Sequence, residues 1–218
     1  LKIPSDVPIG SETLYSCPGY ILLGKILENV FGKRLDELFY EYIAEPLGMK
    51  RTSFHPDNKN QFVNSNLLPE EIGMVNDYNC RFLGGVAGNA GLFSNANDLA
   101  KLCQMWLNGG VYGGERYLSE ATTKQFTEER SEKSRRGLGF DRAPNKEGQG
   151  SPTCDEAPAE TYGHLGFTGT VFWVDPTHDV TFIFLCNRVN PTRNNKAFGS
   201  IDIRPAMFRF FYESLLEK

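Results

Sequence analysis

The sequence predicts an α+β fold with an antiparallel sheet, because segments with helical spacing gather in residues 1–130 and strand-like segments gather in residues 131–218. The 218 residues are 40% hydrophobic and 23% charged, which is typical of a globular chain with a sizeable buried core. We therefore expect a single domain over residues 1–218, mainly helical in its first part, with sheet strands and a closing helix in its second.

Apolar residues recur at helical spacing in three segments of the first part, and a capping serine predicts a fourth, shorter helix. These helices are expected over residues 18–31, 35–43 and 99–107, and after Ser119. Pro18 begins the first helix and Gly32 ends it. Residues 94–97 offer capping side chains for the third helix. Residues 50–80 read mostly as turns and loops.

The second part of the chain contains three strand candidates and a final helix. The candidate strands are residues 137–140, 171–174 and 180–186. The Asp175-Pro176 pair predicts a turn between the last two, so these strands should form an antiparallel hairpin. An amphipathic pattern from Pro205 to Leu216 predicts the closing helix.

Composition and spacing argue against several classes of function. The net charge of −4, with no basic cluster beyond residues 130–136, disfavours a nucleic-acid partner. No apolar run approaches the roughly 20 residues of a membrane span. The five cysteines lack Cys-x-x-Cys spacing, and His55, His164 and His178 are far apart, so we expect no metal site and no cofactor. The glycine-rich residues 84–91 lack the strand-to-helix context of a phosphate-binding loop.

The most informative segment runs from Gly163 to Thr170, where a histidine and two closely spaced glycines precede the apolar run Val171–Val174. We expect it at the edge of a strand. Such an edge can bring backbone N–H groups, a basic side chain and a substrate into contact, and a glycine there lets another backbone approach closely. This segment is the first candidate for a reactive site.

Five segments, taken in order, together resemble the superfamily of serine β-lactamases, penicillin-binding proteins and class C-like esterases. They are Tyr15–Gly24, Pro46–Met49 with Thr52, Gly84–Phe93 with Asp98–Ala100, Gly163–Pro176, and Leu185–Arg188. These matches span essentially the whole chain. The resemblance implies a β-lactamase/transpeptidase-like α/β sandwich whose N-terminal elements are missing from this chain.

In that superfamily a serine of a Ser-x-x-Lys motif, upstream of the tyrosine, carries the acyl group. No Ser-x-x-Lys occurs in these 218 residues. The resemblance therefore implies that the nucleophile, its lysine and the first sheet strands belong to a segment before Leu1. That segment would be part of the same domain and would pack against this chain. The start at Leu1, without an initiator Met or a signal peptide, predicts a processed or excised piece. The superfamily's cell-wall work implies the periplasm or cell envelope.

The resemblance also implies catalytic roles for three residues. Tyr15 would share with the missing lysine the removal of the serine proton, for which a phenol needs positive charge nearby. His164 stands where relatives carry lysine or histidine, so it would supply positive charge or relay a proton. The backbone N–H of Phe167 would form half of the oxyanion hole. Without the resemblance, a tyrosine such as Tyr15 is more often a packing residue at a helix entry, and a histidine such as His164 is more often a hydrogen-bonded strand residue.

The substrate-binding residues implied by the resemblance are Cys17, Gly166, Thr168, Asn89 and Arg188. Arg188 could bind a substrate carboxylate or remain a solvated strand-end arginine. Several positions differ from the usual pattern: Cys17 replaces Asn or Asp, Leu165 replaces a hydroxyl residue, and Asn76 and Asn89 replace histidines. These differences favour an esterase or a D-amino-acid peptidase over an efficient β-lactamase. The expected substrate is a small molecule or a peptide.

Three other interpretations remain open at this stage. The chain could be an inactive module that binds a peptide or cell-wall fragment, trailing a larger envelope glycoside hydrolase. It could be an assembly subunit whose sheet edge pairs with strands from another polypeptide. Finally, Cys17 could be a thiol nucleophile served by His164, because a thiol at a helix N-terminus is activated.

Overall fold

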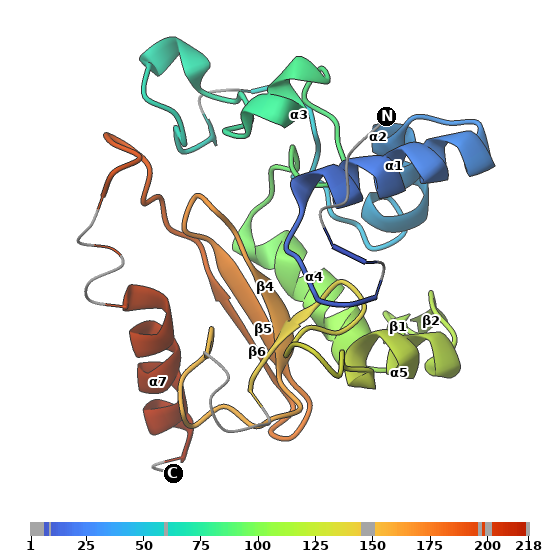
Figure 1. Ribbon diagram of the computed structural model, residues 1–218, viewed down its shortest axis with the longest axis vertical. Helices are drawn as coiled ribbons and strands as arrows, with labels where there is room; N and C mark the ends of the chain where they lie inside the picture. Colours follow the sequence, from blue (N-terminus) through green and yellow to red (C-terminus); the bar gives the residue numbers. More distant parts are fainter. Residues whose placement is uncertain are drawn as a thin grey trace.

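The computed structural model describes residues 7–8, 10–58, 61–144, 151–195, 198 and 202–216 (Figure 1). Helical elements dominate the first part of the chain and the four-stranded sheet lies in the second, which confirms the α+β prediction. The helical elements are α1 (Cys17–Phe31), α2 (Leu35–Phe39), η1 (Tyr40–Ala44), η3 (Pro69–Glu71), α3 (Tyr78–Phe82), α4 (Ala96–Leu107), α5 (Glu120–Glu128) and α7 (Ile203–Leu216). The strands are β1 (Val111–Tyr112), β2 (Glu115–Arg116), β3 (Asp141–Arg142), β4 (Tyr162–Leu165), β5 (Val171–Asp175) and β6 (Val180–Phe184).

The helix boundaries follow the local capping signals. Ser16 is the N-cap of α1, where its hydroxyl accepts the Gly19 N–H at 3.2 Å, and Gly32 ends the helix with a φ of 65°. Asn95 caps α4 and Ser119 caps α5 in the same way. The second predicted helix is split, because α2 continues into the single π-helical turn η1. The four predicted helices of the first part are thus confirmed.

Four antiparallel strands form the main sheet, in the order β3-β4-β5-β6. The predicted hairpin is confirmed, with Asp175 opposite Val180 at its closed end. The predicted strand at residues 137–140 is wrong: these residues bend, Gly139 has a φ of 89°, and β3 begins only at Asp141. Two features were not predicted, namely β4 as a separate strand and the small β1–β2 hairpin.

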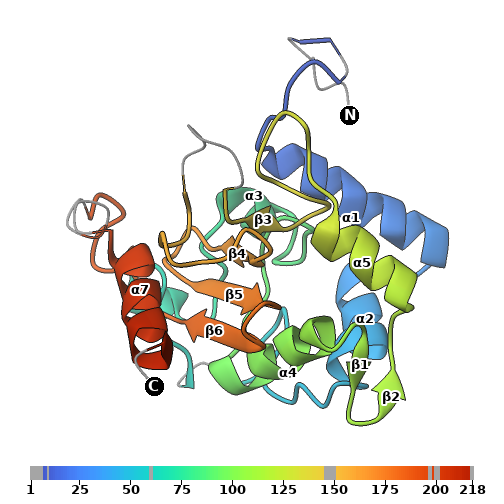
Figure 2. The same ribbon diagram turned by 90° about the horizontal axis from the view of Figure 1, so that it is seen from below.

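Helices pack on both faces of this sheet (Figure 2). Alternate residues of β5 point to opposite faces, as the pleat of a strand requires. Trp173 packs against Phe208 and Tyr212 of α7, whereas Val174 packs with Cys103 of α4. The sheet is therefore the middle layer between α7 and α4, and β4 is held in place by its pairing with β5.

Candidate functional site

A tight turn follows β4 and carries the predicted oxyanion-hole residue. The Gly166 N–H donates to the Thr170 carbonyl at 2.7 Å, and the Gly169 N–H donates to the Gly166 carbonyl at 3.1 Å. Gly169 has a φ of 118°, and a Cβ there would lie 2.8 Å from the Cys186 sulfur, so only glycine fits. The Phe167 N–H has no acceptor among the described residues. It is therefore free to donate to a ligand.

Arg188 fixes the backbone of this turn. Its own N–H donates to the Thr168 carbonyl at 2.8 Å, and its Nε donates to the Phe167 carbonyl at 2.6 Å. Its guanidinium also lies 4.4 Å from the centroid of the Phe167 ring. Four of the predicted site residues, Gly166, Phe167, Thr168 and Arg188, thus lie in or beside this turn, and Arg188 binds the carbonyls of the two residues Phe167 and Thr168.

His164 lies in β4 opposite Phe172, and both of its ring nitrogens have partners. Nδ1 lies 2.9 Å from the Leu165 carbonyl, which can only accept, so Nδ1 carries the proton. Nε2 then accepts from Arg136, whose Nη1 is 3.5 Å away. Burial is the largest effect on the pKa of His164 and lowers it; the hydrogen bond with the Leu165 carbonyl raises it, the Arg136 guanidinium lowers it, and Asp141 raises it least, so that the net direction is downward. The arrangement favours a neutral imidazole.

Tyr15 lies just before α1, and its side chain is 64% exposed. The Arg136 guanidinium carbon is 5.0 Å from the centroid of the Tyr15 ring. Arg136 therefore contacts both predicted catalytic side chains, one by a cation–π contact and the other by a hydrogen bond. The structure brings Tyr15 and His164 to the same guanidinium.

Sequence reasoning missed Arg136 and the buried Asp141 that holds it. Asp141 is 0% exposed, and Arg136 Nη2 lies 3.0 Å from its Oδ2. Arg135 binds the same carboxylate, with Nε 2.7 Å from Oδ1. The available signal was a pair of arginines five to six residues before an aspartate that begins a strand.

Two predicted binding residues make no contact with this cluster in the described part of the chain. The Asn89 amide donates to Asp77 at 3.3 Å, and its Oδ1 is buried without a partner among the described residues. Cys17 is half-buried at the start of α1. Because both nitrogens of His164 are engaged, His164 offers no free base to a Cys17 thiol in this arrangement.

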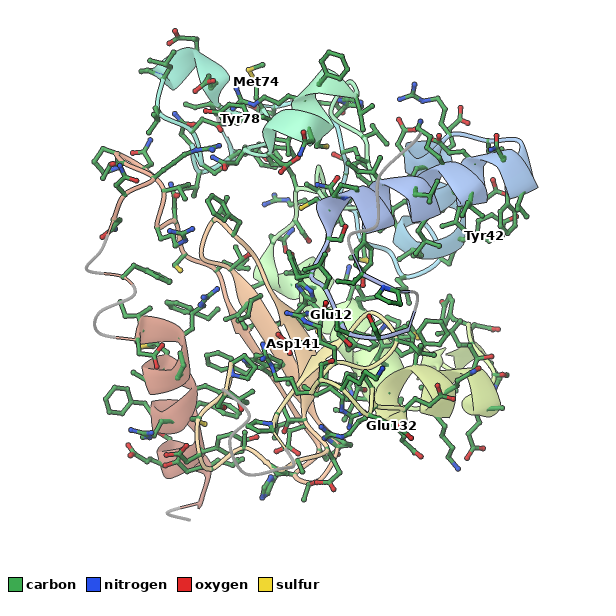
Figure 3. The ribbon with its side chains drawn as sticks, viewed as in Figure 1. Glu12, Tyr42, Met74, Tyr78, Glu132 and Asp141 are labelled. Carbon is green, nitrogen blue, oxygen red and sulfur yellow. The ribbon has the colours of Figure 1, made fainter. Side chains whose placement is uncertain are left out.

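A second group of arginines lies beyond Phe167, toward α3. Arg193 is 4.3 Å from the centroid of the Tyr78 ring and 5.8 Å from that of Phe167. Its Nη2 donates to both oxygens of Asn76, at 2.7 and 2.8 Å. Arg81 lies over Tyr78 at 5.6 Å. Figure 3 shows Tyr78 on α3, so this group joins α3 to the turn after β4.

Within the described residues, no three His, Cys, Asp or Glu side chains gather as metal ligands would. None of the described helices combines the length and apolar character needed to cross a membrane. The chemistry available at the site is therefore that of a phenol, a neutral imidazole, arginines and a free backbone N–H.

Comparison with known proteins points to one family. The family model described as Beta-lactamase matches residues 2–202. A protein of Escherichia coli (strain K12) named "Putative D-alanyl-D-alanine carboxypeptidase" is 35% identical over 226 aligned positions, covering 91% of this chain and 51% of that protein. The chain spans about half the length of the curated relatives it matches.

Solved structures share the fold. A β-lactamase from Mycobacterium bovis has a TM-score of 0.58 at 19% identity and covers 88% of this chain and 65% of its own. A penicillin-binding protein homologue from Caulobacter crescentus has a TM-score of 0.59 at 24% identity, covering 83% of this chain and 54% of its own. At these identities the likeness concerns the fold alone.

Proposed function

Because the chain belongs to the Beta-lactamase family, we propose that it is the C-terminal part of a serine acyl hydrolase that acts on a peptide or an ester. One observation carries the proposal: Tyr15 and His164 both contact the guanidinium of Arg136. Three residues after His164, the backbone N–H of Phe167 has no acceptor among the described residues and can bind an oxyanion. If Tyr15 and His164 served only to pack the fold, they would not need to share an arginine beside a free N–H.

The proposed reaction needs a serine and a lysine from a segment outside these 218 residues. The serine Oγ attacks the acyl carbonyl carbon while its proton passes to the base formed by Tyr15 and that lysine. The Phe167 N–H and the N–H of the serine stabilise the negative oxygen. Collapse expels the alcohol or amine, which takes the proton. Water then attacks the acyl-enzyme by the same route and releases the acid.

Two surfaces of the chain support the existence of such a segment. β6 is the last strand of the sheet among the described residues, so one of its edges has no partner there. The helix α1, which begins two residues after Tyr15, exposes a row of apolar side chains. These are Leu22, Leu23, Ile26, Val30 and Phe31, each between 46% and 72% exposed. We propose that the nucleophile-bearing segment covers both surfaces.

The proposed substrate is a peptide ending in a D-amino acid, or an ester with a nearby negative charge. The name of the Escherichia coli relative supports the first. Arg188 and Arg193 lie beside Phe167, and no carboxylate pairs with either in the described part of the chain. Cys17, in place of a residue that hydrogen-bonds an amide, supports a hydrolase that is a poor β-lactamase.

The test uses a serine-reactive fluorophosphonate on this chain and on a version extended upstream to include a Ser-x-x-Lys segment, with intact masses measured for both. We expect an adduct on the extended protein only. An adduct on the short chain would reveal a nucleophile other than the proposed serine. No adduct on either, together with no turnover of esters or D-alanyl peptides, would refute the hydrolase.

A binding module is the second candidate function, favoured by Cys17 at the amide-recognition position and by the lack of a free nitrogen on His164. It predicts that the extended protein binds a D-Ala-D-Ala peptide in calorimetry while leaving it intact over hours. Cleavage of that peptide would exclude this alternative.

A further inference from the structure

At Arg136, three segments that are distant in the sequence meet at the site. Arg136 comes from residues 131–136, which we call the arginine loop, and it contacts Tyr15 and His164. These three residues are far apart in the sequence. Their meeting is therefore a property of the fold, and it needs a device that holds the guanidinium in one position.

The first part of that device is the buried Asp141. Arg136 Nη2 lies 3.0 Å from its Oδ2, while Nη1 of the same guanidinium faces His164 Nε2. A planar guanidinium with one nitrogen fixed on a carboxylate can aim the other in only a few directions. Asp141 is itself fixed, because it starts β3 and pairs with Gly163, the neighbour of His164.

The second element that holds Arg136 is the arginine loop, which is closed by an internal hydrogen bond and is hydrogen-bonded to the segment before α1. The Ser131 N–H donates to the Arg136 carbonyl at 2.8 Å. Lys133 Nζ donates to the Ser11 carbonyl at 2.9 Å, and the hydroxyls of Thr13 and Ser131 lie 3.3 Å apart. Figures 1 and 2 both show this loop beside the segment that leads into α1. The loop and Tyr15 are therefore placed together.

We propose that Arg136 is a positioning residue of the active site: it holds the Tyr15 ring and the Nε2 of His164 in one arrangement, and its guanidinium is the permanent positive charge that contacts both. This inference rests on the proposed hydrolase function. It assigns to an arginine of the 131–136 loop the charge that the resemblance assigns to His164. The charge of a guanidinium does not depend on pH in the range where enzymes work.

Two charged groups face His164 in the described structure, namely Arg136 and Asp141, and they act in opposite directions. Arg136 opposes a positive imidazole and Asp141 favours one. Burial of the ring, which is the largest effect, also lowers the pKa of His164. With Arg136 in place, His164 accepts a hydrogen bond and stays neutral. Without it, the imidazole loses the positive charge that lowers its pKa, while Asp141, still paired with Arg135, continues to favour its protonation.

The matched variants are Arg136→Met, which removes the charge and keeps most of the length, Arg136→Lys, which keeps the charge, and Arg135→Met. Arg135 shares Asp141 with Arg136 but contacts neither Tyr15 nor His164 in the described part of the chain. Arg135→Met therefore controls for the loss of one arginine from the buried carboxylate. Circular dichroism and thermal unfolding show which variants fold.

The primary measurement is a pH titration of the three histidine Cε1–H signals of this chain by NMR, with His164→Gln to assign the signal. We expect the pKa of His164 to rise in Arg136→Met and to stay low in Arg136→Lys and Arg135→Met. No rise in folded Arg136→Met, or an equal rise in Arg135→Met, would overturn the inference. If Arg136→Met does not fold, Arg136→Gln takes its place with the same two outcomes.

The second measurement is the rate of the extended protein on an ester. We expect Arg136→Met to lower kcat at least tenfold with little change in KM, and to move the acid limb of the kcat–pH profile, because Tyr15 and His164 lose their common support. A change in KM alone would contradict a positioning role. If the extended protein has no activity, the hydrolase proposal fails while the histidine titration still decides the place of Arg136.

Discussion

The helices α1 and α7 have similar lengths, 15 and 14 residues, but they differ in how they are held. In α1 the only buried residue is Gly24, and the apolar side chains are exposed. In α7 Phe208 and Tyr212 are 1% and 0% exposed against the sheet. The helical pattern in the sequence thus predicts both helices equally well. It does not predict whether the apolar face of a helix packs against another part of the chain.

The difference also separates stability from function in this chain. The packed region, α7 with β5 and β6, carries no predicted site residue on its buried face. The exposed region, α1 and the segment before it, carries Tyr15 and Cys17. We infer that the C-terminal layer stabilises the fold, while α1 presents the site to the segment that bears the proposed nucleophile.

The greatest loss of stability is expected when a buried aromatic ring is removed from the packing between α7 and the sheet. Phe208 contacts Phe182 and Tyr212, with ring centroids 4.8 Å apart in both pairs. Phe208→Ala should lower the free energy of unfolding by about 3–5 kcal/mol in urea denaturation. Val30→Ala on α1, where the side chain is 72% exposed, is the matched control and should stay within about 0.5 kcal/mol. Equal losses in the two variants would abolish the contrast between the helices.

A smaller effect is expected from the polar contact that fastens α7 to the β5–β6 turn. The Tyr212 hydroxyl donates to the buried carboxylate of Asp175 at 2.7 Å, and His178 Nδ1 lies 2.6 Å from the same oxygen. Tyr212→Phe keeps the ring packing and removes one hydrogen bond to a charged group, which should cost about 1.5–3 kcal/mol in the same denaturation experiment. A neutral result would mean that α7 is held by its apolar face alone.

Local signals allowed much of the fold to be predicted. Ser16, Pro18 and Gly32 mark the ends of α1 through capping, and Asp175-Pro176 marks the hairpin, because these effects act over a few residues. The predicted strand at 137–140 is wrong because a positive φ at Gly139 bends the chain there. That glycine was visible in the sequence, but its conformation depends on the loop that it closes.

The candidate site was predicted in part, for a different physical reason. Tyr15, His164, Phe167 and Arg188 could be named from short motifs. Arg136 and Asp141 could not, because their role depends on the contact of Arg136 with Tyr15, more than a hundred residues away, and on the pairing of Asp141 with Gly163 in the neighbouring strand. The arginine pair lies close to Asp141 in the sequence, but that spacing does not predict the contacts of Arg136 with Tyr15 and His164. Such pairings become visible only when the fold places them.

The smallest change in stability is expected at the N-cap of α1, and it tests most directly whether α1 and α7 are held in different ways. With so little of its surface packed, α1 depends on its local signals more than α7 does. Ser16→Ala removes the side-chain acceptor of the Gly19 N–H and should cost about 1 kcal/mol in unfolding free energy. Hydrogen exchange of the first turn of α1 should rise by about fivefold, since 1.4 kcal/mol corresponds to a factor of ten, while exchange in α7 should not change. Ser16→Asp keeps an acceptor and is the control. If Ser16→Ala left α1 exchange unchanged, contacts other than the cap would have to fix the start of the helix, and with it the place of Tyr15.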